Sequence, residues 1–287
     1  MIVLTGAGGF IGSVVLGYLN KQGIDDVVLF DDLPTGNQFL NLRDKRYISL
    51  HSTAEIPESA EGIEAVIHIG ADSSTLQRSW ASLYETNVLS TRRWNSFCTA
   101  NDIPFIFTSS AAVYGNGQGP LNHYAFSKLT SENEINGVIL RLFNVYGPNE
   151  YHKDRMASTI YHWYQQLESS NQIKIFENSN QYFRDFIYVE DVARVICFFL
   201  KNYQEGVYDL GTGKSVSFDH VADQCIANKP GKKFYIPMPE DLQAQYQKNT
   251  CASVDALRNA GFDVNSFKSI EEGVKEYFDY LTLNQIY

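Results

Sequence analysis

The chain has 287 residues, of which 44% are hydrophobic and 20% charged, and it carries a formal net charge of −10. This balance is typical of a globular protein with one large or two coupled domains. The acidic charge argues against nucleic acid or an anionic membrane as a partner. The sequence holds no apolar run of the roughly 18–20 residues that span a bilayer. It opens into a strand rather than a signal peptide, so we expect a cytoplasmic location.

The four cysteines show no C-x-x-C spacing and no pattern of histidine partners. We therefore predict buried free thiols, with neither a disulfide nor a metal site. The cysteines are Cys98, Cys197, Cys225 and Cys251.

A glycine motif follows the first apolar segment, a predicted strand near 1–5. Gly6, Gly9 and Gly12 keep the spacing G-x-x-G-x-x-G and open a predicted helix over 10–22. The first glycine permits a tight turn, the second lets a pyrophosphate approach the backbone, and the third lets the helix pack on the sheet. The helix N-terminus then favours the negative charge of a dinucleotide.

A second predicted strand, near 26–31, ends in Asp31 and Asp32. Asp31 lies 19 residues after Gly12, close to the roughly 20 expected for the acid that binds the adenosine ribose. The alternative is a surface loop that happens to carry two acids.

Strand and helix patterns alternate through roughly the first 145 residues, and several strands are almost continuously apolar, as in a parallel sheet covered on both faces. We predict an α/β fold with a doubly wound, Rossmann-like parallel sheet, and a dinucleotide-binding domain over 1–148. Further strands are expected near 47–50, 64–69, 104–109 and 138–142, and further helices at 77–100 and 122–135.

The composition shifts after Pro148, and we expect residues 149–287 to form a smaller, mixed α/β substrate lobe. Within it a helix over 191–203 and a strand at 207–210 are expected, with some elements returning to the first domain. The region 217–287 has the pattern of two or three helices around a strand at 234–236. The two lobes would enclose a cleft.

Tyr124 and Lys128 stand at i and i+4 and would share one helix face. A lysine cation one turn away, together with a cationic nicotinamide, favours the phenolate and lowers the pKa of the tyrosine. The pattern alone is common on surface helices. Here a buried strand that ends in Ser109 and Ser110 precedes it, which favours a catalytic set.

These motifs resemble the extended short-chain dehydrogenase/reductase superfamily, which includes nucleotide-sugar epimerases and dehydratases. The resemblance extends over nearly the whole chain. It rests on Thr-Gly-Ala-Gly-Gly-Phe-Ile-Gly (5–12), Ser-Ser-Ala-Ala-Val-Tyr-Gly (109–115), the Tyr124/Lys128 pair, Arg-Leu-Phe-Asn-Val-Tyr-Gly-Pro (141–148) and Arg-Asp-Phe-Ile-Tyr-Val-Glu-Asp (184–191).

The segment His-Lys-Asp-Arg-Met-Ala-Ser (152–158) is similar to one in ADP-L-glycero-D-manno-heptose 6-epimerases. That resemblance implies transient oxidation of C6 to a ketone with a tightly held NADP, and return of hydride to the other face. Two faces need two proton-transfer groups, because one base cannot easily reach both. The resemblance assigns these roles to Tyr124 and Lys153, with Ser110 polarising the oxygen. The alternative for Lys153 is an ordinary loop lysine.

The resemblance also implies sets of ligand-binding residues and a nucleotide-diphosphate sugar as substrate, in surface polysaccharide synthesis. Arg184 is the candidate for the diphosphate, because guanidinium pairs bidentately with phosphate oxygens. The cofactor set is Gly6, Gly9, Phe10, Ile11, Gly12, Asp31, Asp32, Gly70, Ala71, Asn87, Tyr124, Lys128 and Val145. The substrate set is Ser73, Asn144, Arg155, His162, Phe176, Arg184 and Tyr246.

Three departures from the heptose epimerases leave alternatives open. The chain is shorter between Ser110 and Tyr124, where a loop near the active site is missing. Gln38 replaces a lysine expected near the 2′-phosphate, and Asp31 favours NAD, so the cofactor is NADP or NAD. Arg155 stands where a small hydroxyl residue is usual, and would bind an extra anion or exclude the heptose.

The competing functions are a hexose 4-epimerase, which needs only Tyr124, a 4,6-dehydratase, and a non-catalytic dinucleotide sensor. Dehydration needs an acid pair beside the strand-end hydroxyl, where this chain has Ala111 and Ala112. We also expect a homo-oligomer, whose interface would use aromatic helices that carry Trp80 and Trp94, although a core role fits these residues equally.

Overall fold

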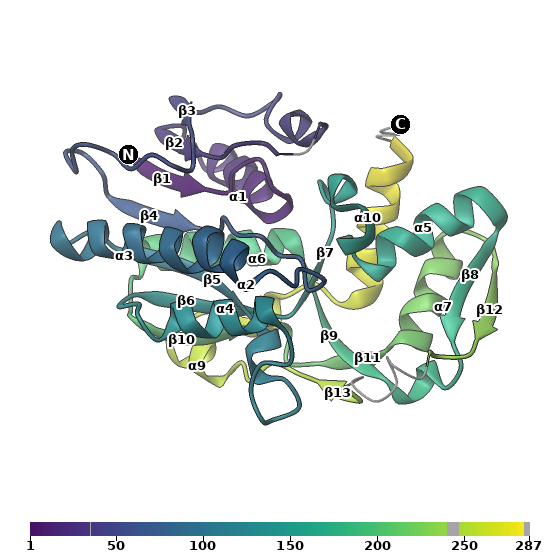
Figure 1. Ribbon diagram of the computed structural model, residues 1–287. Coiled ribbons are helices and arrows are strands. Elements are labelled where there is room, and N and C mark those ends of the chain that lie inside the picture. The colour runs from purple at the N-terminus through teal and green to yellow at the C-terminus, as the bar shows by residue number, and fades with distance from the viewer. Residues whose placement is uncertain (35, 240–246, 284–287) are drawn as a thin grey trace.

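The computed structural model describes residues 1–34, 36–239 and 247–283, and these form two lobes (Figure 1). The first lobe is built on a seven-stranded sheet with the order β10-β6-β5-β4-β1-β2-β3. All its pairings are parallel, which confirms the predicted doubly wound α/β fold. The strands are β1 (Ile2–Thr5), β2 (Val27–Phe30), β3 (Ser49–His51), β4 (Ala65–His68), β5 (Phe105–Ser110), β6 (Val138–Leu142) and β10 (Gly206–Leu210).

Apolar side chains cover both faces of this sheet, which is why β1, β2 and β4 are buried along their whole length. On one face, α1 (Phe10–Lys21) packs against α6 (Val189–Lys201). On the other face, α3 (Ser90–Ala100) contacts β4 and α4 (His123–Glu132) contacts β5. The carboxyl ends of the strands point toward the second lobe (Figure 1).

The helix expected over 77–100 begins at residue 80 and contains a π-helical segment. It starts at α2 (Trp80–Leu83), whose N-cap is Ser79, and continues as a π-helical segment, η2 (Tyr84–Leu89), before α3. Such π turns occur frequently at functional sites.

The second lobe holds several short strands that its composition did not predict. One sheet has the order β11-β9-β13, with β7 added beside β9, and a separate sheet is the pair β12-β8. Helix α7 contacts both sheets, through β11 and through β8. Its apolar core is rich in aromatic rings, among them Tyr146, Trp163, Phe186 and Phe278. The elements are β7 (Asn144–Tyr146), α5 (Thr159–Ser170), β8 (Gln172–Phe176), β9 (Phe183–Tyr188), β11 (Ser215–Ser217), α7 (Phe218–Asn228), β12 (Lys232–Ile236), β13 (Asn249–Thr250) and α10 (Ile270–Leu283).

Short helical turns connect these parts. They include η1 (Gln38–Asn41), η3 (Ala111–Tyr114), η4 (Tyr151–Met156) and α9 (Asp255–Asn259).

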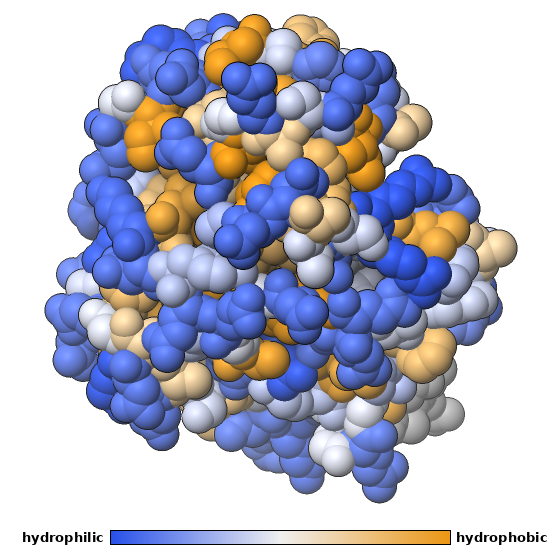
Figure 2. Space-filling model, turned by 90° about the vertical axis from the view of Figure 1, so that its left-hand side faces the viewer, coloured by the Kyte–Doolittle hydropathy of each residue, from blue (hydrophilic) through white to orange (hydrophobic). Residues whose placement is uncertain are grey.

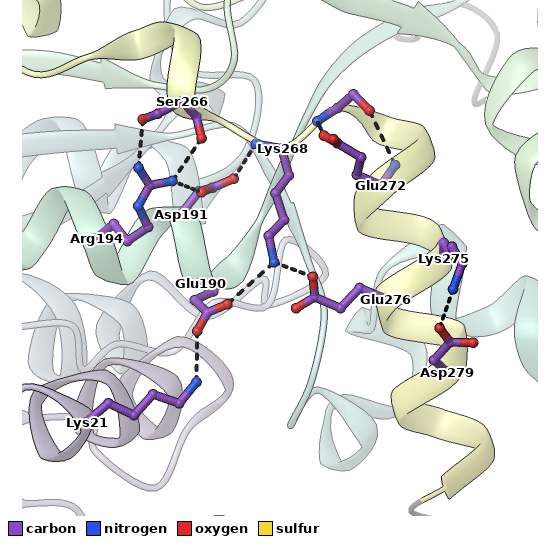
Figure 3. Close-up of polar contacts among 11 residues, drawn as sticks. Lys21, Glu190, Asp191, Arg194, Ser266, Lys268, Glu272, Lys275, Glu276 and Asp279 are labelled. Carbon is purple, nitrogen blue, oxygen red and sulfur yellow. Dashed lines mark hydrogen bonds and ion pairs between the residues drawn. The ribbon is translucent and has the colours of Figure 1, made fainter.

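The chain crosses between the lobes more than once, because α6 and β10 lie beyond residue 148 but pack in the first lobe. A chain of ion pairs joins the lobes (Figure 3). The Oε1 atom of Glu190 on α6 accepts from Lys21 Nζ of α1 at 2.8 Å, and its Oε2 atom lies 3.5 Å from Lys268 Nζ. Lys268 also pairs with Glu276 of α10. Helices from both lobes therefore share one run of alternating charges.

The surface is mostly hydrophilic on the face shown in Figure 2, with separate apolar patches between polar side chains. Among the described residues, no helix is long and apolar enough to span a membrane. One cysteine prediction is wrong, because Cys251 is exposed. It lies at the end of β13 rather than inside a packed helix or strand. Trp94 is 2% exposed and belongs to the core.

Candidate active site

The glycine-rich turn is closed by backbone contacts that leave no room for side chains. Gly6 has φ +68°, and a Cβ there would lie 2.6 Å from the Gly70 backbone. A Cβ at Gly12 would lie 2.0 Å from the Gly6 carbonyl oxygen. The turn after β1 therefore packs directly against the loop after β4. Helix α1 packs directly against the turn, as the spacing of the motif predicts.

The N-terminus of α1 has no side-chain cap and no acidic residue in its first turn. In contrast, α4, α5 and α7 are capped by Asn122, Ser158 and Ser217. The first N–H groups of a helix need acceptors from elsewhere, and the helix dipole favours an anion there. This terminus therefore suits a phosphate group.

The two acids after β2 have different partners. Asp31 is buried, and its carboxylate accepts from Gly8 N at 2.9 Å and Leu33 N at 2.8 Å. Burial raises the pKa of Asp31, and these backbone hydrogen bonds oppose the rise. Asp32 is exposed and accepts from Ser52 and Thr53 in the loop after β3. Asp31 therefore ties the glycine-rich turn to the segment after β2, and its remaining lone pairs fit ribose hydroxyls.

Asn87 lies in the π-helical turn and is 1% exposed. Its side chain accepts from Asp72 N at 2.9 Å and donates to Asp72 O and to Ser127 Oγ on α4, both at 3.0 Å. Asn87 thus fixes the loop that carries Gly70 and Ala71 against the helix that carries Tyr124. In this position it holds two walls of the predicted cofactor site together.

Ser110, Tyr124 and Lys128 meet where β5 ends beside α4. Tyr124 is 9% exposed, and burial raises its pKa to about 12, against a side-chain hydrogen bond with Ser110 that lowers it. Lys128 Nζ donates to Thr108 O at 2.8 Å and lies 4.6 Å from the centre of the Phe107 ring. Burial lowers the pKa of Lys128 to about 7.

In the protein without nucleotide, burial dominates the pKa of Tyr124, and the lowering expected from Lys128 together with a cationic nicotinamide stays a prediction. The lysine is itself buried and donates to the backbone of β5, and burial lowers its pKa. Tyr124 is therefore a proton donor in the free protein.

A buried ion pair behind this set was not anticipated. Glu132 follows Lys128 by one turn of α4, is 8% exposed, and bonds to Ser109 Oγ. Its carboxylate also accepts from Arg141 Nη2 at 2.6 Å and from Arg141 Nε at 3.1 and 3.2 Å. The i+4 spacing from Lys128 was a signal that could have found Glu132. The pair holds the strand end next to Ser110.

Lys153 lies on η4, and its Nζ is 5.4 Å from the centre of the Phe10 ring at the start of α1. Burial lowers the pKa of Lys153, and the charge of Glu150 opposes this. Glu150 is 1% exposed and accepts from Ser158 Oγ at 2.7 Å. The structure thus places Lys153 next to the glycine-rich turn, on a loop that a buried carboxylate anchors. The sequence pattern around Glu150 did not indicate this role, so the residue was not predicted.

Arg184, on β9, is 9% exposed. Its Nη1 donates to Phe183 O and Gln247 O, both at 2.8 Å, and its guanidinium lies 5.6 Å from the Phe218 ring centre. Phe176 ends β8 and His162 lies on α5, both half-buried. Tyr246 lies outside the described residues.

The other predicted substrate residues are exposed. They are Ser73 after β4, Asn144 on β7, whose Nδ2 donates to Asp185 O at 3.2 Å, and Arg155 on η4.

The remaining predicted cofactor residues lie in or near the first core. Phe10 is 5% exposed, whereas Ile11 and Val145 are partly buried against that core.

These residues fit a dinucleotide. The glycine cradle, the uncapped helix terminus and the buried Asp31 come together, and one polar atom beside them lacks a partner. Asn41 is 4% exposed and donates to Gly8 O at 2.9 Å, while its Oδ1 has no hydrogen bond among the described residues. A buried acceptor next to the turn suits a ligand that carries hydroxyl groups.

Residues 2–211 match the NAD dependent epimerase/dehydratase family, and the chain belongs to it. Among solved structures, the Helicobacter pylori ADP-L-glycero-D-manno-heptose-6-epimerase is 25% identical, with a TM-score of 0.83 over 98% of this chain and 96% of that one. The Methanobrevibacter ruminantium UDP-N-acetylglucosamine 4-epimerase, solved with UDP-N-acetylmuramic acid, is 24% identical, with a TM-score of 0.83 over 99% and 98% of the two chains. TunA, an NDP-hexosamine 5,6-dehydratase of tunicamycin biosynthesis, is 23% identical, with a TM-score of 0.82 over 99% and 98%. The last two likenesses bear on the fold alone.

Proposed function

We propose that the protein is a nucleotide-sugar epimerase that oxidises a sugar carbinol to a ketone and reduces it again on the other face. The substrate that fits the sequence motifs is an ADP-glycero-manno-heptose, with C6 as the reacting carbon. The observation that carries the proposal is the set of Ser110 with the buried Tyr124 and Lys128, at the sheet edge that also presents the glycine-rich turn.

The roles of the side chains follow from their surroundings. A bound nicotinamide dinucleotide would supply the hydride acceptor and donor. Tyr124 Oη is the group that exchanges a proton with the sugar oxygen. Ser110 forms a hydrogen bond with Tyr124 and polarises the sugar oxygen. Lys128 supplies positive charge one helical turn away.

Lys153 is proposed as the second proton-transfer group. Burial favours its neutral form, which is the form that can accept a proton, and its anchored loop keeps the amine beside the start of α1. An epimerase of this kind needs a group on each face of the reacting carbon. A hexose 4-epimerase would need Tyr124 alone, which makes Lys153 the residue that separates the two proposals. NAD and NADP both remain candidate cofactors, and a homo-oligomer remains a prediction.

The test is incubation of the purified protein with ADP-D-glycero-D-manno-heptose, followed at C6 by NMR. Conversion to the L-glycero epimer is expected. Tyr124→Phe and Lys153→Met should each lower turnover by roughly 10²–10⁴-fold while cofactor content stays unchanged, because each removes one proton-transfer group. Lys174→Met, which changes an exposed lysine on β8, is the control.

Full activity of Lys153→Met would overturn the two-base mechanism. Conversion of UDP-glucose at C4 and none of the heptose would overturn the proposed substrate and establish the 4-epimerase.

A further inference from the structure

A hollow of about 520 Å³ lies on the first lobe, outside the Ser110, Tyr124 and Lys128 set, and its lining residue Leu33 borders the predicted cofactor site through Asp31. It is formed by η1, by the segment that follows it and by β3, the edge strand of the sheet. Its size is that of a pocket for a small organic molecule. The proposed epimerase reaction gives no role to the cationic residues of this hollow, Arg43, Lys45 and Arg46.

Three cations line this pocket in a chain whose net charge is −10. Arg43 pairs with Asp44 at 3.3 Å and Arg46 pairs with Asp25 at 2.8 Å. Lys45, between them, has no ion pair within the part of the chain that the structure describes. The pocket therefore keeps an uncompensated positive charge.

Lys45 is held at the pocket by its packing on α1. A Cβ at Gly17 would lie 3.1 Å from Lys45 Cε and 3.5 Å from its Nζ, so the lysine stem lies along the helix where a side chain is missing. Burial lowers the pKa of Lys45, the charge of Asp44 opposes this, and those of Lys21 and Arg43 add to it. An ammonium group in such surroundings gains from an anionic partner.

The rest of the lining is apolar and partly aromatic. Phe39 is 54% exposed, Tyr47 37% and Leu50 38%, which is unusual for three large side chains around one hollow. Aromatic rings at a cationic groove are the pattern that binds a nucleobase by stacking while cations hold the phosphate.

We propose that this pocket binds a nucleoside phosphate, with its phosphate on Lys45 and the flanking guanidinium groups and its base against Phe39 and Tyr47. The proposal does not depend on the epimerase reaction. Guanidinium and ammonium groups together favour a phosphate over a carboxylate, because they match its charge and its several acceptor oxygens.

The experiment is calorimetric titration of the full chain, saturated with NAD, with AMP, adenosine and inorganic phosphate as probes. AMP is expected to bind at least tenfold more tightly than either fragment. Lys45→Met, which keeps the apolar stem, should weaken AMP binding at least tenfold. Phe39→Ala should weaken the binding of AMP and leave the binding of inorganic phosphate unchanged. Lys174→Met should change neither.

Arg184→Met separates this pocket from the proposed substrate site. Binding of AMP that persists in Arg184→Met and is lost in Lys45→Met supports the proposal, whether or not the protein proves to be an epimerase. Binding that is unchanged in Lys45→Met, or phosphate binding as tight as that of AMP, would overturn it.

Discussion

Tyr124 and Lys128 lie on one helix, whereas Arg184, His162 and Phe176 come from three separate elements of the second lobe. The elements around Tyr124 and Lys128, here called the first wall of the predicted cleft, are held by buried hydrogen bonds. The second wall is formed by these three side chains of the second lobe, and it depends on how α5, β8 and β9 pack together. Substitutions in the second wall can therefore change which substrate binds, while the reactive groups of the first wall stay the same.

A substitution at Glu132 should have a large effect on stability, and it tests whether buried contacts hold the first wall. Glu132→Gln leaves the partly buried charge of Arg141 without its bidentate partner, so we expect a loss of about 3 kcal/mol in the free energy of unfolding. Urea denaturation measures it. Glu134→Gln breaks an exposed pair with Arg92 and should cost less than about 1 kcal/mol. Equal losses in the two variants would show that the first wall is not held by its buried pair.

A smaller effect is expected from Arg184 in the second wall. Arg184→Met should raise the KM for the nucleotide sugar about tenfold with little change in kcat, because it removes binding rather than chemistry. Steady-state kinetics measure both constants. Arg258→Met, which alters an exposed pair with Asp255, is the control. A fall in kcat at constant KM would place Arg184 with the reactive groups of the first wall.

A pH dependence of stability is also expected, and it arises from Lys128. Burial lowers its pKa from 10.5 to about 7, so the unfolded chain binds more protons between these values. Stability from this group therefore rises with pH across that window, and the cost of burying the charge is fully present below pH 7. Lys128→Met should gain more stability relative to wild type at pH 7 than at pH 10, as urea midpoints of the cofactor-free protein would show. A gain that does not change with pH would contradict the buried position of the charge.

The sequence predicted the first lobe well because its signals are local. The glycine spacing, the apolar strands and the four-residue step from Tyr124 to Lys128 each lie within a few residues, and the structure brings them together. The second lobe was harder, since β9 pairs with strands from 144–146, 215–217 and 249–250. No local pattern predicts such distant partners.

The same limit applies to single residues. Asn41 contacts Gly8 and Asn149, which are 33 and 108 positions away, so its place beside the turn follows only from the fold. The raised pKa of Tyr124 likewise depends on burial, which the Tyr-x-x-x-Lys spacing does not reveal.

The interleaved path of the chain has a consequence for how the protein unfolds. Because β10 completes the edge of the first sheet and α6 covers its face, a fragment that ends near residue 148 would lack a strand and expose the apolar side of α1. The Lys21–Glu190–Lys268 connection adds a charged link between the same regions. The two lobes are therefore expected to lose structure in one cooperative transition, and neither can be excised as an independently folding piece.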